Sequence, residues 1–323
     1  MGLIKEALWT SKTSKIQTIA IIVGIAILAV IPGFTDPYAP LFLAWIVAYG
    51  VMAVAWTFFS GKTGYISLAS AAFMGLGMYL QALLGRELPL AVTMILSAAV
   101  AFAAAFGIGV ITLRLRGVYF TIFTFGLALF LNKIIRWYEV TYTFTKGRMV
   151  KAYDNDLVLY AMLVILGIVL FTVIIMNKSR FGLSLDCIGQ NEDSAQHVGV
   201  NTTMTKVLAF AISAAPVGAV GAVMSTTIGY VDPEIAFRIL ASFFPVLMAI
   251  FGGMHSLYGP LVGAAVFYSL QDYLLRKTDY YMIIFGAVMI VVILLMPKGL
   301  FGLIEDIMAK RRRGFDGEVI GDV

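Results

Sequence analysis

Side chains that carry chemistry are scarce in this sequence. Cys187 is the only cysteine, so no disulfide can form within the chain. The two histidines, His197 and His255, fit ordinary loop residues better than metal ligands. No G-x-x-x-x-G-K-S/T run is present, so the chain lacks the loop that cradles nucleotide phosphates in many ATPases. We therefore expect no enzyme active site, no catalytic residue, no metal and no cofactor.

Charged residues are also few. They make up 13% of the chain, against about a quarter in a typical soluble domain, while 61% is hydrophobic and the mean hydropathy is +0.94. Several apolar runs approach the roughly 20 residues that cross a bilayer core. The net charge of +5 suits basic residues that gather on cytoplasmic loops, not a nucleic-acid partner. The composition predicts an all-α polytopic membrane protein, with residues 1–323 forming a single transmembrane domain in the lipid bilayer.

About ten apolar segments are candidate membrane spans, although eight are also compatible with the pattern. They begin near Ile16, Leu41, Ile66, Leu90, Val118, Leu157, Val207, Ile239, Leu261 and Tyr281. The run at 16–31 follows a basic N-terminus and precedes no small-residue cleavage site, so we expect an uncleaved first span. An even number of spans with the N-terminus inside places most lysines and arginines in the cytoplasm. Both termini, including a basic tail at 298–323, and the polar loop at 177–206 are therefore expected on the cytoplasmic side.

The polar loop at 177–206 stands between two apolar spans and is long enough to fold. Ser184 or Asp186 could cap the start of a short surface helix, and Gly199 followed by Asn201 would stop it. The apolar positions that fall close to one face of such a helix are Ile188, Ala195 and Val198. A soluble partner could grip a helix of this kind. Periodicity alone is equally compatible with a plain solvated loop.

Two apolar segments, 61–84 and 252–275, are rich in glycine and small residues. Glycine tolerates a broken helix where backbone groups face a cavity. The first segment has Gly75 and Gly77 at mid-depth, and the second contains the helix breaker Gly259–Pro260. Both share the pattern Tyr-x-x-Leu-x-small-Ala-Ala, which suggests an internal repeat with a translocation path at its interface, although tight packing without a path is the alternative. The candidate path residues are Ser67, Ser70, Gly75, Gly77, Gly252, Gly253 and Gly259.

Ionisable residues are nearly absent from the middle of the expected spans. Asp272, beside Gln271, is the strongest candidate, yet it lies toward the outer end of its span. Proton- or sodium-coupled carriers and charge-selective channels usually place such groups in the pathway. The run at 218–223 has too few glycines for a dinucleotide site and fits helix packing. We expect any uphill transport to draw its energy from another chain, while a secondary carrier and a structural or channel-like subunit stay open.

Several segments together point to one family. LRLRGVYFTIFTFGLA at 113–128 is similar to an L-R-L-R-G-x-Y-x-x-I-x-T-x motif, and 180–223 is similar to a longer motif that contains E-N-E and K-x-x-A-F-x-I-S-A. Further similar pieces lie at 61–79, 231–234, 252–254 and 297–302. In this order, the pieces resemble the branched-chain amino-acid ABC permeases of the LivH/LivM type, and most of all the LivM half.

This resemblance implies the ABC-importer permease fold, in a subunit that does not itself hydrolyse ATP. In such systems a LivH-like second permease pairs with the LivM-like chain as a heterodimer, two cytoplasmic ABC ATPases dock below, and a periplasmic binding protein delivers the substrate. Branched-chain or similar small neutral amino acids would cross a bacterial or archaeal inner membrane by alternating access. Other small neutral solutes, such as urea or amides, would also suit a path without fixed charge.

The resemblance also implies that the polar loop holds the ATPase-docking helix. Residues 190–193 would face the ATPase groove, while Ile188 and Val198 would anchor the helix to the bundle. The docking residues expected in full are Asp186, Ile188, Gln190, Asn191, Glu192, Asp193, Val198 and Gly199.

The chain departs from the family pattern within this docking helix. The family's basic residues are absent at Leu183 and Gly189, and its usual glutamate is an amide at Gln190. We therefore expect weaker electrostatic docking or an unusual ATPase partner.

Overall fold

The computed structural model describes residues 38–278 with three exceptions, Arg116, Thr145 and His255. Outside this range it describes only Gly24 and isolated positions between Tyr280 and Gly299. The expected first and last spans, both termini and the basic tail therefore lie outside the described residues, apart from those isolated positions.

Apolar helices occur at all of the remaining expected spans. Their bounds are α2 Tyr38–Trp56, α3 Ser70–Leu84, α4 Leu90–Thr112, α5 Val118–Tyr138, α6 Asn155–Lys178, α9 Thr202–Ile228, α11 Leu240–Gly252 and α12 Gly259–Lys277. π-helical turns extend α2 over Thr57–Gly61 and α5 over Glu139–Thr143. Within the described residues, six helical stretches are long and apolar enough to cross a bilayer. The expectation of an all-α polytopic membrane protein is confirmed.

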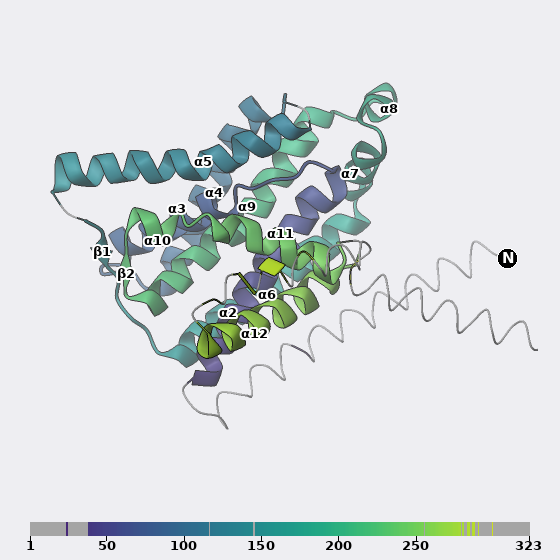
Figure 1. The fold of residues 1–323 in the computed structure, drawn as a ribbon. Helices are drawn as coiled ribbons and strands as arrows, with labels where there is room; N and C mark the ends of the chain where they lie inside the picture. Colours follow the sequence, from purple (N-terminus) through teal and green to yellow (C-terminus); the bar gives the residue numbers. More distant parts are fainter. Residues whose placement is uncertain are drawn as a thin grey trace, which may run out of the picture.

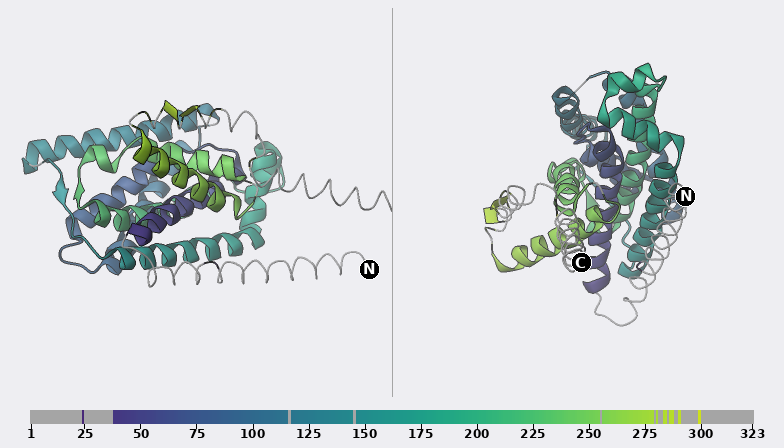
Figure 2. Two further views of the ribbon diagram at one scale, coloured as in Figure 1. Left: turned by 60° about the horizontal axis from the view of Figure 1, so that its bottom comes forward. Right: turned by 90° about the vertical axis from the view of Figure 1, so that its right-hand side faces the viewer.

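The helices form a bundle with two distinct ends (Figure 1). One end carries two short helices, α7 (Arg180–Gln190) and α8 (Glu192–His197). The opposite end carries α10 (Pro233–Ala236) and an antiparallel pair of short strands, β1 (Arg148–Met149) and β2 (Tyr230–Val231). Figure 2 shows the same separation from another side, with most of the long helices running between the two ends.

Helix α9 lies at the centre of the bundle and packs against α3 and α4, whereas α2 packs against α6 and α12. Gly218 of α9 is so close to α4 that a Cβ there would lie 2.6 Å from the Ser97 carbonyl oxygen. Gly221 approaches the Met74 carbonyl of α3 in the same way. Small residues thus let three helix backbones meet, which is how helices associate where lipid removes the hydrophobic driving force. The helix-packing interpretation of 218–223 is confirmed.

The chain leaves the helix between α2 and α3, where residues 64–69, the extended break, form no regular structure. Backbone groups at membrane depth need partners inside the protein, and other helices supply them here. Leu68 N–H donates to Thr124 Oγ1 of α5 at 3.1 Å. Trp56 Nε1 of α2 donates to the Ser67 carbonyl at 2.8 Å. Further hydrogen bonds to the extended break and the first turn of α3 involve the hydroxyls of Ser60, Thr121 and Ser242.

The interruption expected around Gly75 and Gly77 is therefore displaced, because both glycines lie inside α3. A Cβ at Gly77 would overlap the Gly218 carbonyl of α9, and a Cβ at Gly75 would overlap the ring of Phe237. These glycines allow close contact between elements instead of breaking the helix. Local sequence favours either role for glycine, and only the packing partners decide between them.

The second interruption lies where the sequence predicts it. Gly253 follows α11 with a φ of 105°, a conformation that side chains rarely adopt, and α12 begins at Gly259 with Pro260 in its first turn. Ser256 Oγ accepts a hydrogen bond from Gly259 N–H at 2.8 Å. The pattern shared by the two segments falls on different structures, since residues 66–69 after Tyr65 form no regular structure whereas the residues after Tyr258 are helical from Gly259 on.

Candidate functional site

The polar loop folds into the two helices α7 and α8, which we call the docking segment (180–197). Ser179 caps α7 by accepting a hydrogen bond from Gly182 N–H on its Oγ, and Asn191 caps α8 by accepting one from Ser194 N–H at 2.9 Å. The expectation of a helix is confirmed. The caps expected at Ser184 and Asp186 are wrong, because both residues lie inside α7.

Asn191 divides the segment because its backbone is extended, so one expected helix becomes two. Gly199 ends α8 with a φ of 90°, as predicted for a helix stop, and Asn201 caps α9 by accepting from Met204 N–H. The sequence thus identifies the end of the segment, but it does not reveal the corner in the middle.

Three apolar side chains attach the docking segment to the bundle. Leu185 and Ile188 of α7 and Ala195 of α8 are buried. Val198, expected as the second anchor, is 85% exposed, and that expectation is wrong. Val198 lies past the end of α8 as its C-cap, and ten residues of helix after Ile188 would set it about 80° to the side of that residue even in one continuous helix.

The outward surface of the docking segment is polar and only weakly charged. Gln190, Asn191 and Asp193 are exposed, as expected for residues that meet a partner. Asp186 is also exposed, and its carboxylate accepts a hydrogen bond from Lys62 Nζ at 2.9 Å. An ion pair this open to solvent adds about 0–1 kcal/mol, so it orients α7 more than it stabilises it.

Glu192 differs from its neighbours because its side chain turns toward the bundle. Its Oε1 lies 2.5 Å from Nζ of Lys206 at the start of α9, and its Oε2 accepts a hydrogen bond from the Tyr65 hydroxyl at 2.5 Å. Only 15% of the Glu192 side chain is exposed. The expectation that Glu192 faces an ATPase groove is therefore wrong.

Lys206 is 2% exposed, and all three of its ammonium protons have acceptors. Besides Glu192, Nζ donates to the Tyr65 hydroxyl at 3.0 Å and to the Leu113 carbonyl at 3.3 Å, and it lies 4.3 Å from the centre of the Tyr65 ring. A buried charge without such partners would be strongly unfavourable. We call Tyr65, Glu192 and Lys206 the Lys206 cluster. It joins α8, α9 and the extended break.

A close backbone contact explains one departure from the family pattern. A Cβ at Gly189 would overlap the Lys62 carbonyl oxygen. No side chain fits there unless α7 moves away from the end of α2. A basic residue at this position would therefore change how the docking segment packs against the bundle. Leu183, the other position without a basic residue, is exposed on α7 and has no such constraint.

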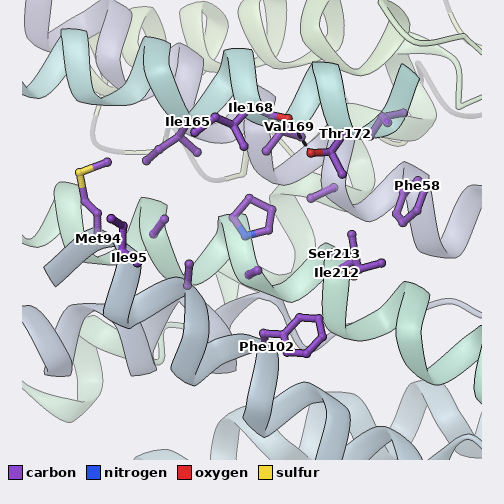
Figure 3. Close-up of a pocket in the computed structure, with 16 residues that line it drawn as sticks. Phe58, Met94, Ile95, Phe102, Ile165, Ile168, Val169, Thr172, Ile212 and Ser213 are labelled. Carbon is purple, nitrogen blue, oxygen red and sulfur yellow. Dashed lines mark hydrogen bonds between the residues drawn. The ribbon is translucent and has the colours of Figure 1, made fainter. Parts of the chain in front are cut away.

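Three cavities line parts of the bundle. The largest, about 650 Å³, is partly polar and lies beside α7, with a lining that includes Thr57, Lys62, Asn177, Asp186, Gln190 and Ser256. A second, about 300 Å³, is almost wholly apolar and lies between α4, α6 and α9 (Figure 3). Phe58 lines both, so the two are adjacent.

The third cavity is small, about 20 Å³, and it holds two of the expected path residues. Ser67 and Ser70 line it together with Ser60, Ser213 and a group of aromatic side chains, Trp56, Phe59, Phe73 and Phe210. Ser213 also lines the apolar cavity. We call the small cavity the constriction.

The remaining expected path residues, all glycines, lie in close contacts. Gly75 and Gly77 pack against neighbouring elements, while Gly252, Gly253 and Gly259 form the corner between α11 and α12. Within the part of the chain that the structure describes, no group of three His, Cys, Asp or Glu side chains could hold a metal ion.

Comparisons with known proteins agree on one family. A family model described as branched-chain amino acid transport system / permease component matches residues 39–293. The high-affinity branched-chain amino acid transport system permease protein LivM of Salmonella typhimurium LT2 is 26% identical over 278 residues, which cover 74% of this chain and 64% of the relative. LivM of Escherichia coli K12 is 25% identical over 296 residues, or 80% of this chain and 68% of the relative.

A likeness over a shorter stretch extends to a second permease protein, LivH. LivH of Escherichia coli K12 is 28% identical over 132 residues, which cover 40% of this chain and 42% of the relative. The alignment with the Salmonella LivM, described above, spans less than two thirds of the length of that protein.

Proposed function

The chain belongs to the family of branched-chain amino acid transport system permease components, and we propose that it is the LivM-like permease subunit of an ABC importer. In this role it conducts the substrate, while separate chains bind and hydrolyse ATP. Its proposed partners are a LivH-like second permease, two cytoplasmic ABC ATPases and a substrate-binding protein outside the membrane.

The docking segment is the observation that supports this role most directly. It presents exposed polar side chains at one end of an apolar bundle, while Leu185, Ile188 and Ala195 hold it to the bundle. A surface helix of this kind gives a soluble partner a rigid point of attachment. We propose that the ATPases bind the surface around Gln190 and Asp193, which places this end of the bundle in the cytoplasm together with both termini.

The mechanism follows from this attachment. Closure of the ATPase pair on ATP would displace the docking segments of the two permeases, and the helices would rock between inward- and outward-facing arrangements. The close glycine contacts of α9 with α3 and α4 suit such a motion, because tightly packed backbones move as rigid bodies.

The linings of the cavities favour a small neutral substrate with an apolar side chain. The apolar cavity has no charged residue in its lining, and the adjoining constriction offers serine hydroxyls between aromatic rings. A branched-chain amino acid suits this combination better than urea or a simple amide does, because its side chain can occupy an apolar space. Uptake of labelled leucine and labelled urea by the reconstituted transporter separates the two, and uptake driven by an ion gradient without ATP would instead indicate a secondary carrier.

The docking assignment is tested by reversing the surface charge without touching the Lys206 cluster. We expect Gln190→Arg with Asp193→Lys to abolish co-purification of the ATPases while the permease still inserts into the membrane. Glu87→Lys, an exposed charge reversal in the turn between α3 and α4, is the matched control and should leave ATPase recovery unchanged. Normal recovery of the ATPases with the double variant would exclude this surface as their binding site.

A further inference from the structure

The Lys206 cluster joins the surface of the protein to the extended break. Glu192 lies in the first turn of α8, Lys206 in the first turns of α9, and Tyr65 within residues 64–69. The bonds that unite them are the 2.5 Å contacts of Glu192 with Lys206 and with Tyr65. Charge-assisted hydrogen bonds of this length are about twice as strong as neutral ones.

The extended break is joined in turn to the constriction. Ser67 stands two residues after Tyr65 and lines the constriction, and its carbonyl is held by Trp56 Nε1 at 2.8 Å. Only Ile66 separates Tyr65 from Ser67, and planar peptide groups of fixed bond length join the three residues. A displacement of Tyr65 would therefore be felt at Ser67.

The apolar contacts of the docking segment are of a different kind, and its ion pair between Asp186 and Lys62 is open to solvent. Leu185 and Ile188 meet the bundle through apolar surfaces, which can slide without leaving a charge unpaired. Lys206 is 2% exposed, so separating it from Glu192 would leave a buried ammonium group without its counter-charge. When α8 is displaced, we expect the three residues of the Lys206 cluster to move together, with their hydrogen bonds intact.

We propose that the Lys206 cluster is the linkage through which movement of the docking segment reaches the constriction, with the Tyr65 hydroxyl as the positioning group. The linkage rests on the proposed function, since it needs a partner that moves α8. In this proposal Glu192 connects two parts of the permease to each other and does not contact the ATPase. The extended break then widens or closes the constriction as α8 moves.

Tyr65→Phe tests the linkage, because it removes the hydroxyl and keeps the ring beside the ammonium group. Tyr79→Phe is the matched control, since Tyr79 is as buried as Tyr65 (7% and 8% exposed) but lies near the other end of α3, stacked on Phe237. In the complex assembled with its ATPases, we expect Tyr65→Phe to retain ATP hydrolysis and to lower the substrate moved per ATP by about tenfold, the scale of a typical coupling energy. Tyr79→Phe should keep the wild-type ratio.

A distance measurement tests the same linkage without relying on transport. Spin labels at Val198→Cys and Ile66→Cys, both exposed positions, in a Cys187→Ser background would report whether α8 and the extended break move together. Without Tyr65→Phe, we expect the distance between the two labels to stay constant when ATP binds. With Tyr65→Phe added, we expect this distance to change when ATP binds.

Three outcomes would overturn the proposals, and they are distinguishable. A wild-type chain that purifies without ATPases refutes the proposed function. Assembly with a normal transport ratio in Tyr65→Phe refutes the linkage alone. A label separation that changes equally with and without Tyr65→Phe also refutes the linkage alone.

Discussion

Removing the charge of Glu192 should harm the protein more than removing both charges of its pair with Lys206. Glu192→Gln leaves an ammonium group that is 2% exposed beside an uncharged amide, with the Tyr65 ring and hydroxyl and the Leu113 carbonyl as its other neighbours. Breaking a buried ion pair from one side typically costs about 3–5 kcal/mol. Since these neighbours still stabilise the cation, we expect about 2–3 kcal/mol for this variant.

The double variant Glu192→Gln with Lys206→Met removes the unpaired charge. Replacing a buried pair by uncharged groups of similar size is often close to neutral, so we expect a cost of about 1 kcal/mol. Lys206→Met alone leaves Glu192 with the Tyr65 hydroxyl and some access to water, and it should fall between the two. Non-additivity of this size is usual for residues in direct contact.

Thermal unfolding of the detergent-purified chain measures this order. The fraction that remains monodisperse after heating should give the highest midpoint for the wild type, then the double variant, and the lowest for Glu192→Gln. If the double variant unfolds at a lower temperature than both single variants, the buried pair does not hold the charge of Lys206 as described, and the reasoning from its burial is refuted.

Three further substitutions probe the surrounding structure. Gly189→Ala places a methyl group against the Lys62 carbonyl and should cost about 1–3 kcal/mol as α7 shifts, seen as weaker ATPase recovery together with a lower unfolding midpoint. Thr124→Val keeps the shape of the side chain but leaves the Leu68 N–H without its acceptor, so the midpoint should fall by the equivalent of about 1–3 kcal/mol; an unchanged midpoint would contradict the role given to this hydroxyl. Gly218→Val forces α9 away from α4 and should prevent accumulation of folded protein in the membrane, measured by size-exclusion chromatography of the extracted chain, where a wild-type profile would contradict the close contact.

Helix positions in the bundle follow closely from the sequence. The spans predicted to begin near Leu90 and Val118 begin at those residues in α4 and α5. The span predicted near Val207 begins earlier, at Thr202, because Asn201 caps a first turn that is polar and thus looks like loop. Apolar length determines where a helix can cross lipid, and capping residues then determine where it starts.

The extended break is a feature that local sequence does not reveal. Its acceptor Thr124 is 56 positions from Leu68, and Ser242 is 171 positions from Ala71. A hydroxyl so far along the sequence from its backbone partner gives no local indication of a break. The sequence therefore points to the glycines at 75 and 77 instead. Lys206 is hidden for a related reason, since a lysine beside an apolar span fits the general excess of basic residues on cytoplasmic loops.

The two interruptions of the bundle differ in what holds them, and this difference bears on which one can move. At the second, a Cβ on Gly252 would overlap the Gly259 carbonyl and a Cβ on Gly263 would overlap that of Met248, so two backbones are in direct contact with no room to shift. At the extended break, hydroxyl groups such as Thr124 hold the backbone, and a hydroxyl can rotate and follow a carbonyl or N–H through a small displacement. The rigid corner is therefore suited to support the bundle, and the extended break to yield. The hydrogen bond between Glu192 of α8 and Tyr65 therefore connects the docking segment to the interruption that can move, and not to the rigid corner.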